Sequence, residues 1–170
     1  MAEVPSDMSE PDAIVGGADD EVFQPQISIE TQFIKDLSFE NPVGPNAAEI
    51  ITQTPEVSVE VSTNARPLEG DKYEVAIMIR GEAKTKEATV FIVELTYAGV
   101  LTVSNAPQDA IGPILLIEGA RLLFPFARNI VADVSRDGGF PPLLINPIDF
   151  SQLYRDQHMA EGSTNGVATD

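Results

Sequence analysis

The sequence predicts an α+β fold, in which a four-stranded antiparallel sheet is followed by a long kinked helix, an apolar connecting loop and a second helix. Runs of alternating apolar and polar residues, separated by turn signals, extend from residue 27 to about residue 104. After Pro107 the apolar residues recur at helical spacing, and the proline-rich stretch 137–150 separates this helix from a second helical segment. Strands followed by helices are typical of an α+β plan.

The length and composition fit a single domain with extended ends. A chain of 170 residues that is 43% hydrophobic can build one ordinary core. The first 25 residues are acidic, rich in Pro, Gly and Ser, and free of Lys and Arg, and residues 160–170 are similarly polar. Such segments do not bury enough apolar surface to offset the entropy of ordering them. We therefore expect a folded domain at 26–159 between a disordered N-terminal extension, 1–25, and a disordered tail, 160–170.

The charge and the scarce residue types limit the possible functions. A net charge of −17 repels phosphate and anionic headgroups, which makes nucleic acid an unfavourable ligand and favours basic partners. The chain has no Cys and a single histidine, His158, which excludes disulfides, thiolate zinc sites, cysteine nucleophiles and histidine clusters. It also has no GxxxxGK[ST] phosphate-binding loop. We expect no catalytic residue, metal or cofactor, and therefore no enzyme.

The N-terminus lacks the basic and apolar regions of a secretory signal. No later apolar run is expected to be long enough to span a bilayer. The sequence therefore predicts a cytoplasmic protein that does not insert into membranes.

The first strand is predicted at 27–39, where apolar and polar residues alternate. Ile34 and Lys35 invert the alternation, which indicates a bulge or a solvated edge near them. The solvated side of this strand carries carboxylates at Glu30, Asp36 and Glu40.

Three further strands are predicted at 56–63, 72–81 and 89–104, and the turns between them are polar. In the last strand one face carries Phe91, Val93, Leu95 and Tyr97, and the other carries Val90 and Ile92. Since a single helix layer covers one face of a sheet, a strand that is apolar on both faces predicts contact with another subunit, and hence an oligomer.

The long helix is predicted between Pro107 and Arg136 and ends at Gly138 and Gly139. Its apolar face carries Leu116, Ala120, Leu123, Ala127, Ile130 and Val134, and its polar side, with Glu118, Arg121 and Arg128, is a candidate contact between subunits. Pro125 predicts a kink within it. A second helix is predicted to begin with Asn146 as its cap, Pro147 at its first position and Asp149 completing a capping pair.

The loop "DGGFPPLLINPIDF" is unusually apolar for a connection between helices. Its three prolines exclude a helix interior or a central strand, and connecting segments normally run over the surface and are polar. One interpretation is that Phe140, Leu143 and Leu144 are hydrophobic filler over the sheet. Another is that the loop and a two-faced sheet enclose a small apolar ligand, as in a carrier with a closed cavity.

Four segments in the expected order carry a resemblance to a known family. They are "FIKDLSFENP", "ELTYAGVLTV", "LLFPFAR" and above all "GGFPPLLINPIDFSQLY". Together they make residues 27–154 similar to the bacterial protein-export chaperones of the SecB family. The chain has Gly119 and Ala120 where many members have Cys-Pro, and its acidic N-terminal extension is long.

The resemblance implies an ATP-independent chaperone that keeps unfolded precursor proteins competent for export and delivers them to the SecA ATPase. It also implies a homotetramer arranged as a dimer of dimers. Acidic residues that dock SecA in this family correspond here to Asp36, Glu40 and Glu87, while Thr85 stands where the family has a leucine.

In this context residues 138–146 of the apolar loop are predicted to form the wall of a long apolar groove for unfolded clients, between the helix layer and the sheet. Phe140, Leu143 and Leu144 of the loop, with Phe91 and Tyr97 of the last strand, are the predicted contact residues. The prolines restrict the free loop, so less entropy is lost on binding, and they lack N–H donors that would need partners in a dry groove.

Overall fold

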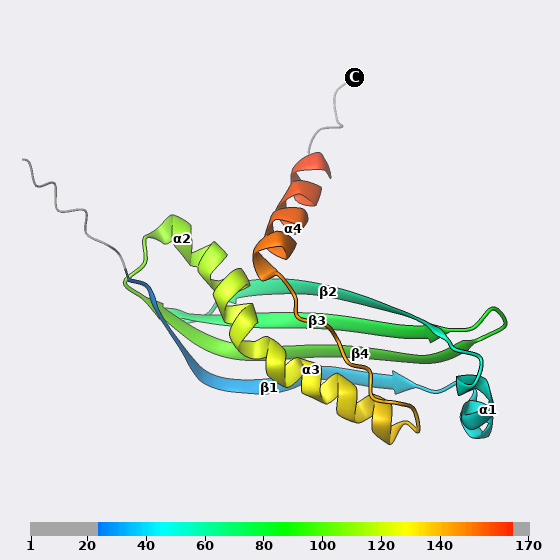
Figure 1. The fold of residues 1–170 in the computed structure, drawn as a ribbon. Coiled ribbons are helices and arrows are strands. Elements are labelled where there is room, and N and C mark those ends of the chain that lie inside the picture. Colours follow the sequence, from blue (N-terminus) through cyan, green and yellow to red (C-terminus); the bar gives the residue numbers. More distant parts are fainter. Residues whose placement is uncertain (1–23, 165–170) are drawn as a thin grey trace, which may run out of the picture.

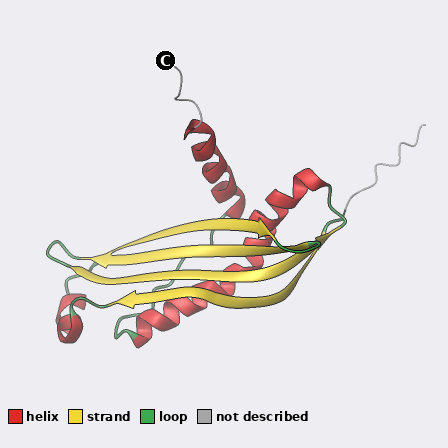
Figure 2. Cartoon of the chain, turned by 180° about the vertical axis from the view of Figure 1, so that it is seen from behind, coloured by secondary structure: helices red, strands yellow, loops and turns green. Residues whose placement is uncertain are grey.

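The computed structural model describes residues 24–164, which form an antiparallel sheet with helices on one of its faces (Figure 1). The strands are β1 (Gln26–Glu40), β2 (Glu56–Pro67), β3 (Lys72–Lys84) and β4 (Thr89–Ser104). They lie in the order β1-β4-β3-β2, so β1 and β2 are the two edges. Seen from behind, the opposite face carries no helix among the described residues, and we call it the open face (Figure 2). The predicted α+β fold and its four strands are confirmed.

The helices follow the predicted order with one addition. Between β1 and β2 lie a 3-10 turn, Gly44–Asn46, and the short helix α1 (Ala47–Ile51), neither of which was predicted. The predicted disorder of residues 1–23 and 165–170 concerns segments outside the described residues. The last helix, α4 (Phe150–Thr164), continues five residues past the predicted domain end at 159.

The predicted bulge in the first strand is present, and a second bulge accompanies it. The register between β1 and β4 shifts between Ile29 and Thr31 and again between Ile34 and Asp36, which leaves Glu30 and Lys35 without a direct partner. Beyond the second shift, Asp36 lies opposite Thr96. Each bulge re-aims the residues that follow it. The carboxylates at 36 and 40 therefore project from the open face.

The prediction that residues 90–97 are apolar on both faces was wrong. The register between β3 and β4 shifts between Ala83 and Lys84, so Val90 lies in a bulge. Its side chain is buried and lines the same hollow as Phe91. The open face of this strand carries Ile92, Glu94 and Thr96, of which Glu94 is exposed. A bulge leaves no mark on an uninterrupted apolar run, which explains the error.

The long helix is continuous from Gln108 to Asp137 but not uniform. It comprises α2 (Gln108–Pro113), a π-helical segment (Ile114–Gly119) and α3 (Ala120–Asp137). α3 continues as one α-helix through Pro125, which a kinked helix also does, so the kink there stays a prediction. The departure from α-geometry is the π segment, which ends before Pro125.

The buried face of the long helix is rotated from the predicted one. Ala120, Leu123 and Ala127 are buried as expected, whereas Leu116, Ile130 and Val134 are only partly buried. Leu115, Phe124, Val131 and Ser135 are buried instead. After Ala127 the buried positions recur every four residues, at Val131 and Ser135. The prediction had spacings that alternate between four and three residues, which placed Ile130 and Val134 on this face.

By length and composition this helix could cross a membrane, so the expectation that no run is long enough was wrong on that measure. One such helix is weak evidence, because the core helix of a soluble protein passes the same test. Here Leu123 and Val131 are fully buried in the core that the helix forms with the sheet. The packing in the structure accounts for the apolar residues on its inner face.

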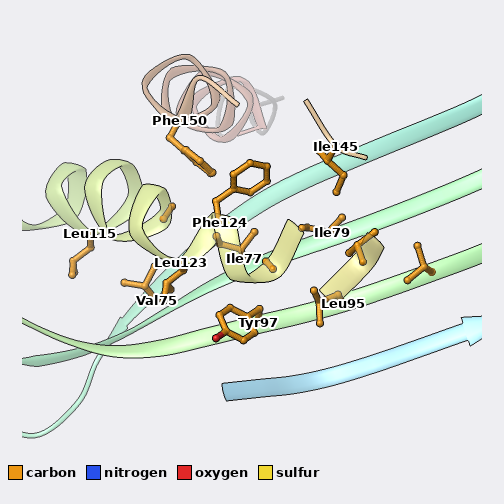
Figure 3. Close-up of a cluster of buried hydrophobic side chains, with 14 of the residues drawn as sticks. Val75, Ile77, Ile79, Leu95, Tyr97, Leu115, Leu123, Phe124, Ile145 and Phe150 are labelled. Carbon is orange, nitrogen blue, oxygen red and sulfur yellow. The ribbon is translucent and has the colours of Figure 1, made fainter. Parts of the chain in front are cut away.

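The second predicted helix begins three residues later than expected. Asp149, not Asn146, is the cap: its Oδ1 accepts the backbone N–H of Ser151 at 2.9 Å and of Gln152 at 3.1 Å. The preceding residues belong to the connecting loop, in which Ile145 points into the core (Figure 3) and is buried. From Phe150, which packs edge-on against Phe124 at 5.5 Å, α4 projects away from the sheet.

Candidate functional site

The apolar loop crosses back over the helix-covered side of the sheet and is tied to the end of α3. We call residues 140–149 the strap. The backbone N–H of Phe140 donates to the carbonyl of Ser135 at 3.1 Å, and that of Leu143 donates to the Ser135 hydroxyl oxygen at 2.8 Å. The Ser135 hydroxyl donates in turn to α3 carbonyls, at 2.9 Å to Val131 and 3.0 Å to Ala132. A fully buried serine therefore fixes where the strap begins.

Two glycines make room for the chain near the strap. A Cβ at Gly81 on β3 would lie 2.7 Å from the Leu143 side chain, so Leu143 occupies the space that the missing side chain leaves. A Cβ at Gly138, just before the strap, would lie 2.2 Å from the Phe39 ring. The strap approaches the sheet this closely only because neither position carries a side chain.

Phe140 joins an aromatic cluster beneath the strap. Its ring centroid lies 5.0 Å from that of Phe91, which stacks on Phe39 at 5.7 Å. Phe91 and Phe140 are each only 5% exposed. The two rings therefore form the base of the site, and the more exposed apolar side chains above them form its surface.

An apolar groove separates the strap from the edge strand β2. One hollow of about 580 Å³ is lined by residues of both elements and of α4: Val57, Val59, Val61, Leu143, Leu144, Ile145, Asn146, Pro147, Ile148 and Leu153. A smaller hollow of about 190 Å³ adjoins it at Val57, Leu143 and Leu144 and reaches Phe91 and Phe140. We call the two together the groove. Its rim is open, because Leu144 is 65% exposed and Val57 is 47% exposed.

The structure brings together four of the five predicted groove residues, Phe91, Phe140, Leu143 and Leu144, at one hollow. Tyr97 is not among them. It is buried beneath α3, where its ring stacks on Phe126 at 6.5 Å, and burial raises the pKa of its hydroxyl. The prediction missed the β2 valines. Their shared face was visible in the alternation, but their place at the groove depends on β2 being an edge strand.

The open face has a different character, because its cations are already paired. Arg66 and Lys35 both bind Glu74, with Arg66 at 2.6 Å. Lys72 binds Glu30 at 2.7 Å. Further along the sheet, Arg80 pairs with Glu94 and Lys84 with Glu82.

Glu74 is the buried centre of this ion-pair arrangement. Hydrogen bonds from Arg66 and then from Lys35 lower the pKa of its carboxyl from 4.5 to about 2. Lys35 reaches it from the predicted bulge of β1, across β4. The bulge therefore places a cation over the sheet and ties three strands together on the open face.

The predicted acidic residues lie in three places. Asp36 and Glu40 are exposed on the open face, and neither forms an ion pair within residues 24–164. Glu87 is exposed in the β3–β4 turn, where its N–H donates to the Thr85 hydroxyl at 3.3 Å. Glu40 lies opposite Ile92, near the same end of the sheet as that turn. Two of the three predicted carboxylates therefore share the open face, and the third lies in the turn at one end of the sheet.

This arrangement presents two surfaces of different character. The part of the chain that the structure describes contains no group of three His, Cys, Asp or Glu residues placed to hold a metal. The groove presents apolar side chains along the exposed edge of β2. The open face presents Asp36 and Glu40, which form no ion pair within residues 24–164. Such a molecule is suited to holding apolar polypeptide and to contacting a basic surface.

The sequence matches one family model, described as preprotein translocase subunit SecB, over residues 20–161. A protein-export protein SecB of Azorhizobium caulinodans is 46% identical over 137 residues, which cover 81% of this chain and 86% of that protein. A protein of the same name from Zymomonas mobilis is 50% identical over 133 residues, covering 78% and 80% of the two chains.

A solved structure shares the fold. It is the SecB-like chaperone Rv1957 of Mycobacterium tuberculosis in complex with a ChAD peptide from the Rv1956 HigA1 antitoxin. The TM-score is 0.58 at 16% identity, and the likeness covers 72% of this chain and 90% of that one.

Proposed function

The chain belongs to the SecB family, and from that membership we propose that it is a protein-export chaperone that holds unfolded precursor polypeptides in the groove. The observation that carries the proposal is the open apolar rim formed by Leu144 of the strap and Val57 and Val59 of β2. A folded protein normally covers such side chains, and an unfolded polypeptide offers apolar side chains to bury against them.

A carrier for a small apolar ligand is less well supported. Such a carrier encloses most of its ligand, usually in a largely preformed pocket. The groove is open along β2, and the aromatic side chains at its base, Phe91 and Phe140, fill the space beneath the strap. The geometry therefore favours an extended segment over a compact small molecule.

We further propose that bound clients pass to the SecA ATPase through the open face, with Asp36 and Glu40 as the principal contacts and Glu87 at the margin. Support comes from their exposure and from the lack of ion pairs at Asp36 and Glu40 within residues 24–164. Such carboxylates attract a basic partner at long range, and binding it breaks no ion pair that they form within the described chain. Holding would need no ATP, and release would be driven by the partner.

We propose that the protein works as a homotetramer, a dimer of dimers, in the cytoplasm. Exposed apolar side chains other than those of the groove support an assembly: Ile34 and Leu37 on β1, and Leu122 and Phe126 on α3. A surface with this many exposed large apolar groups is a candidate for subunit contacts.

The direct test is suppression of the aggregation of a chemically unfolded client, without ATP, by wild-type protein and by Leu144→Ser. Leu144 is exposed, so the variant should fold normally yet suppress aggregation less effectively. Met159→Ser removes another exposed apolar side chain, from α4 and outside the groove, and should leave client holding per folded protein unchanged. Equal activity of Leu144→Ser and wild type would count against the groove as the client site.

A further inference from the structure

A small hollow on the open face holds two cations that converge on one buried carboxylate. Its volume is about 220 Å³, and all four strands line it: Lys35 of β1, Asn64 and Arg66 of β2, Glu74, Ala76 and Met78 of β3, and Thr96 of β4. The charged residues of this lining are two cations and one carboxylate, which leaves one positive charge in excess in a chain whose net charge is −17. We call it the cationic hollow.

The buried carboxylate of Glu74 orders both cations without using all of their donors. Arg66 donates to it from Nε at 3.1 Å and from Nη2 at 2.6 Å, and Lys35 donates to the same Oε1 atom. The Nη1 group of Arg66 and two of the three N–H groups of Lys35 form no hydrogen bond within residues 24–164. A second anion would therefore meet cations whose side chains are already held in place, which reduces the entropy lost on binding.

Two neutral side chains add donors to the same hollow. The Asn64 amide and the Thr96 hydroxyl both line it, and neither forms a side-chain hydrogen bond with another part of the described chain. An amide and a hydroxyl can each donate to an oxygen atom. Together with the two cations, they offer a set of donors that suits one carboxylate group.

A larger hollow of about 450 Å³ adjoins the cationic hollow and has the opposite charge. The two share Met78 and Thr96 in their linings. The charged residues of the larger hollow are three carboxylates and one cation: Asp36, Glu60, Glu94 and Arg80. We call it the acidic hollow. The open face therefore places a negative and a positive site next to each other, with one methionine common to both.

This pair of hollows selects the chemistry of its occupant. A partner surface with basic groups alone would meet repulsion from Lys35 and Arg66, and one with acidic groups alone would meet repulsion from the acidic hollow. The chain's own residues 1–25 contain no Lys or Arg, so they complement the cationic hollow only. A partner that carries an acidic side chain among basic ones complements both hollows.

We propose that the cationic hollow receives an aspartate or glutamate side chain of the protein that docks on the open face, while the acidic hollow receives a basic one. The inference rests on the proposed docking of SecA and specifies its chemistry: the contact surface of SecA carries an acidic side chain among its basic groups. Paired sites of opposite charge also fix the position of the partner along the strands, because a shifted partner would bring like charges together.

The first experiment adds one negative charge at either of two outward positions of β2 and measures SecA binding by titration calorimetry at low salt. Asn64→Asp places a carboxylate in the cationic hollow, and Ser62→Asp places one in the acidic hollow. The two variants have the same net charge, and neither removes an existing ion pair.

The two variants should differ in the sign of their effect. We expect Asn64→Asp to weaken SecA binding about tenfold, because the new carboxylate occupies the donors of the hollow, and Ser62→Asp to leave the affinity unchanged or raise it. A face that acts only through its overall negative charge would bind a basic partner at least as tightly in both variants. Unchanged or tighter binding by Asn64→Asp would therefore overturn the proposal.

The second experiment removes cations instead. Arg66→Gln should weaken SecA binding about tenfold although it makes the chain more acidic, and Arg66→Lys should recover part of the affinity, since it restores the charge without the guanidinium fork. Lys72→Gln removes a cation of the open face outside the hollow, and should bind SecA at least as tightly as wild type. Equal affinities of Arg66→Gln and Lys72→Gln would contradict the proposal. If Arg66→Gln lowers the urea midpoint enough to disturb the sheet, Asn64→Asp decides.

A double-mutant cycle then identifies the acidic partner residue. Among Asp→Asn and Glu→Gln variants of SecA, one should weaken binding to the wild-type protein but not to Asn64→Asp. If none does, the carboxylate site is wrong. If wild type binds SecA and reversal of Asp36 and Glu40 weakens it, while the hollow variants have no effect, the proposed docking stands and this inference fails. If the wild-type protein binds no SecA, the docking itself fails, and this inference fails with it.

Discussion

The hydroxyl oxygen of Ser135 accepts the backbone N–H of Leu143 at 2.8 Å, which joins the last turns of α3 to the strap. Ser135 is fully buried, and its hydroxyl donates to a carbonyl of its own helix. The Ser135 hydroxyl thus holds Leu143, which lines the groove, at a fixed position relative to α3. It also explains why a serine lies on the apolar face of a core helix.

Replacing this serine should loosen the strap. Ser135→Ala leaves the Leu143 N–H without its acceptor in a largely buried place, which costs about 1–3 kcal/mol. We expect a lower urea midpoint, together with faster exchange of the Leu143 amide. Ser28→Ala, at an exposed position on β1, should change neither quantity. An unchanged Leu143 exchange rate in Ser135→Ala would show that the hydroxyl does not hold the strap.

The close approach of Leu143 to Gly81 of β3 provides a second test. Gly81→Ala places a methyl group 2.7 Å from the Leu143 side chain and 3.0 Å from Val93, so Leu143 must move outward. We expect a loss of about 1–3 kcal/mol in urea unfolding, typical of overpacking, and altered client binding. Gly112→Ala, at an open helical site with no atom near its Cβ, should be neutral or slightly stabilising. Equal stability of the two variants would mean that the strap adjusts freely.

The ion pairs of Glu74 should make stability depend on acid. Its pKa is lowered to about 2 in the folded protein from the usual 4.5, so its contribution is fully present above about pH 5 and is lost as the pH falls toward 2. The urea midpoints of wild type and Glu74→Gln should differ most at pH 7. The difference should shrink progressively as the pH falls from about 4.5 toward 2. Glu60→Gln, which has no ion pair within residues 24–164, should give a smaller difference that does not shrink in this way. If the midpoint difference between wild type and Glu74→Gln did not change with pH, the ion pairs of Glu74 would not be the cause of the acid dependence.

Local patterns predicted the strands, and even the bulge at Lys35, because alternation and its inversion are visible in neighbouring residues. The bulge at Val90 was hidden, since an apolar run looks the same whether or not one residue is unpaired. The start of α4 was misplaced because Asn146 and Asp149 are both good caps. The hydrogen bonds that Asp149 accepts from the Ser151 and Gln152 N–H groups decide between them.

The site was predictable where it depends on one segment and not where it depends on strand order. The strap residues stood out because an apolar loop is unusual, and the structure places Leu143 and Leu144 at the groove. The valines of β2 needed the order β1-β4-β3-β2, which alternation does not contain. Tyr97 lies on the expected face of its strand, but at the point where α3 crosses it.

The last prediction concerns the open face and the proposed docking of SecA. Asp36 and Glu40 are exposed and lie outside the ion pairs that occupy Lys35, Arg80 and their neighbours. Reversing both charges, Asp36→Lys with Glu40→Lys, should therefore leave the fold intact and weaken SecA binding at least about tenfold at low salt. The wild-type affinity should itself fall as salt rises, since the Debye length shrinks to about 10 Å at 0.1 M.

A matched control separates position from net charge. Asp109→Lys with Asp137→Lys changes the total charge by the same amount at exposed positions of the helix layer, and it should retain SecA binding if docking uses the open face. Client holding should survive in both double variants, because the groove lies along β2 on the other face of the sheet. Binding of SecA can be measured by titration calorimetry across a salt series. If the two double variants lose affinity equally, the attraction comes from the overall charge of the chain, and Asp36 and Glu40 are not the contact.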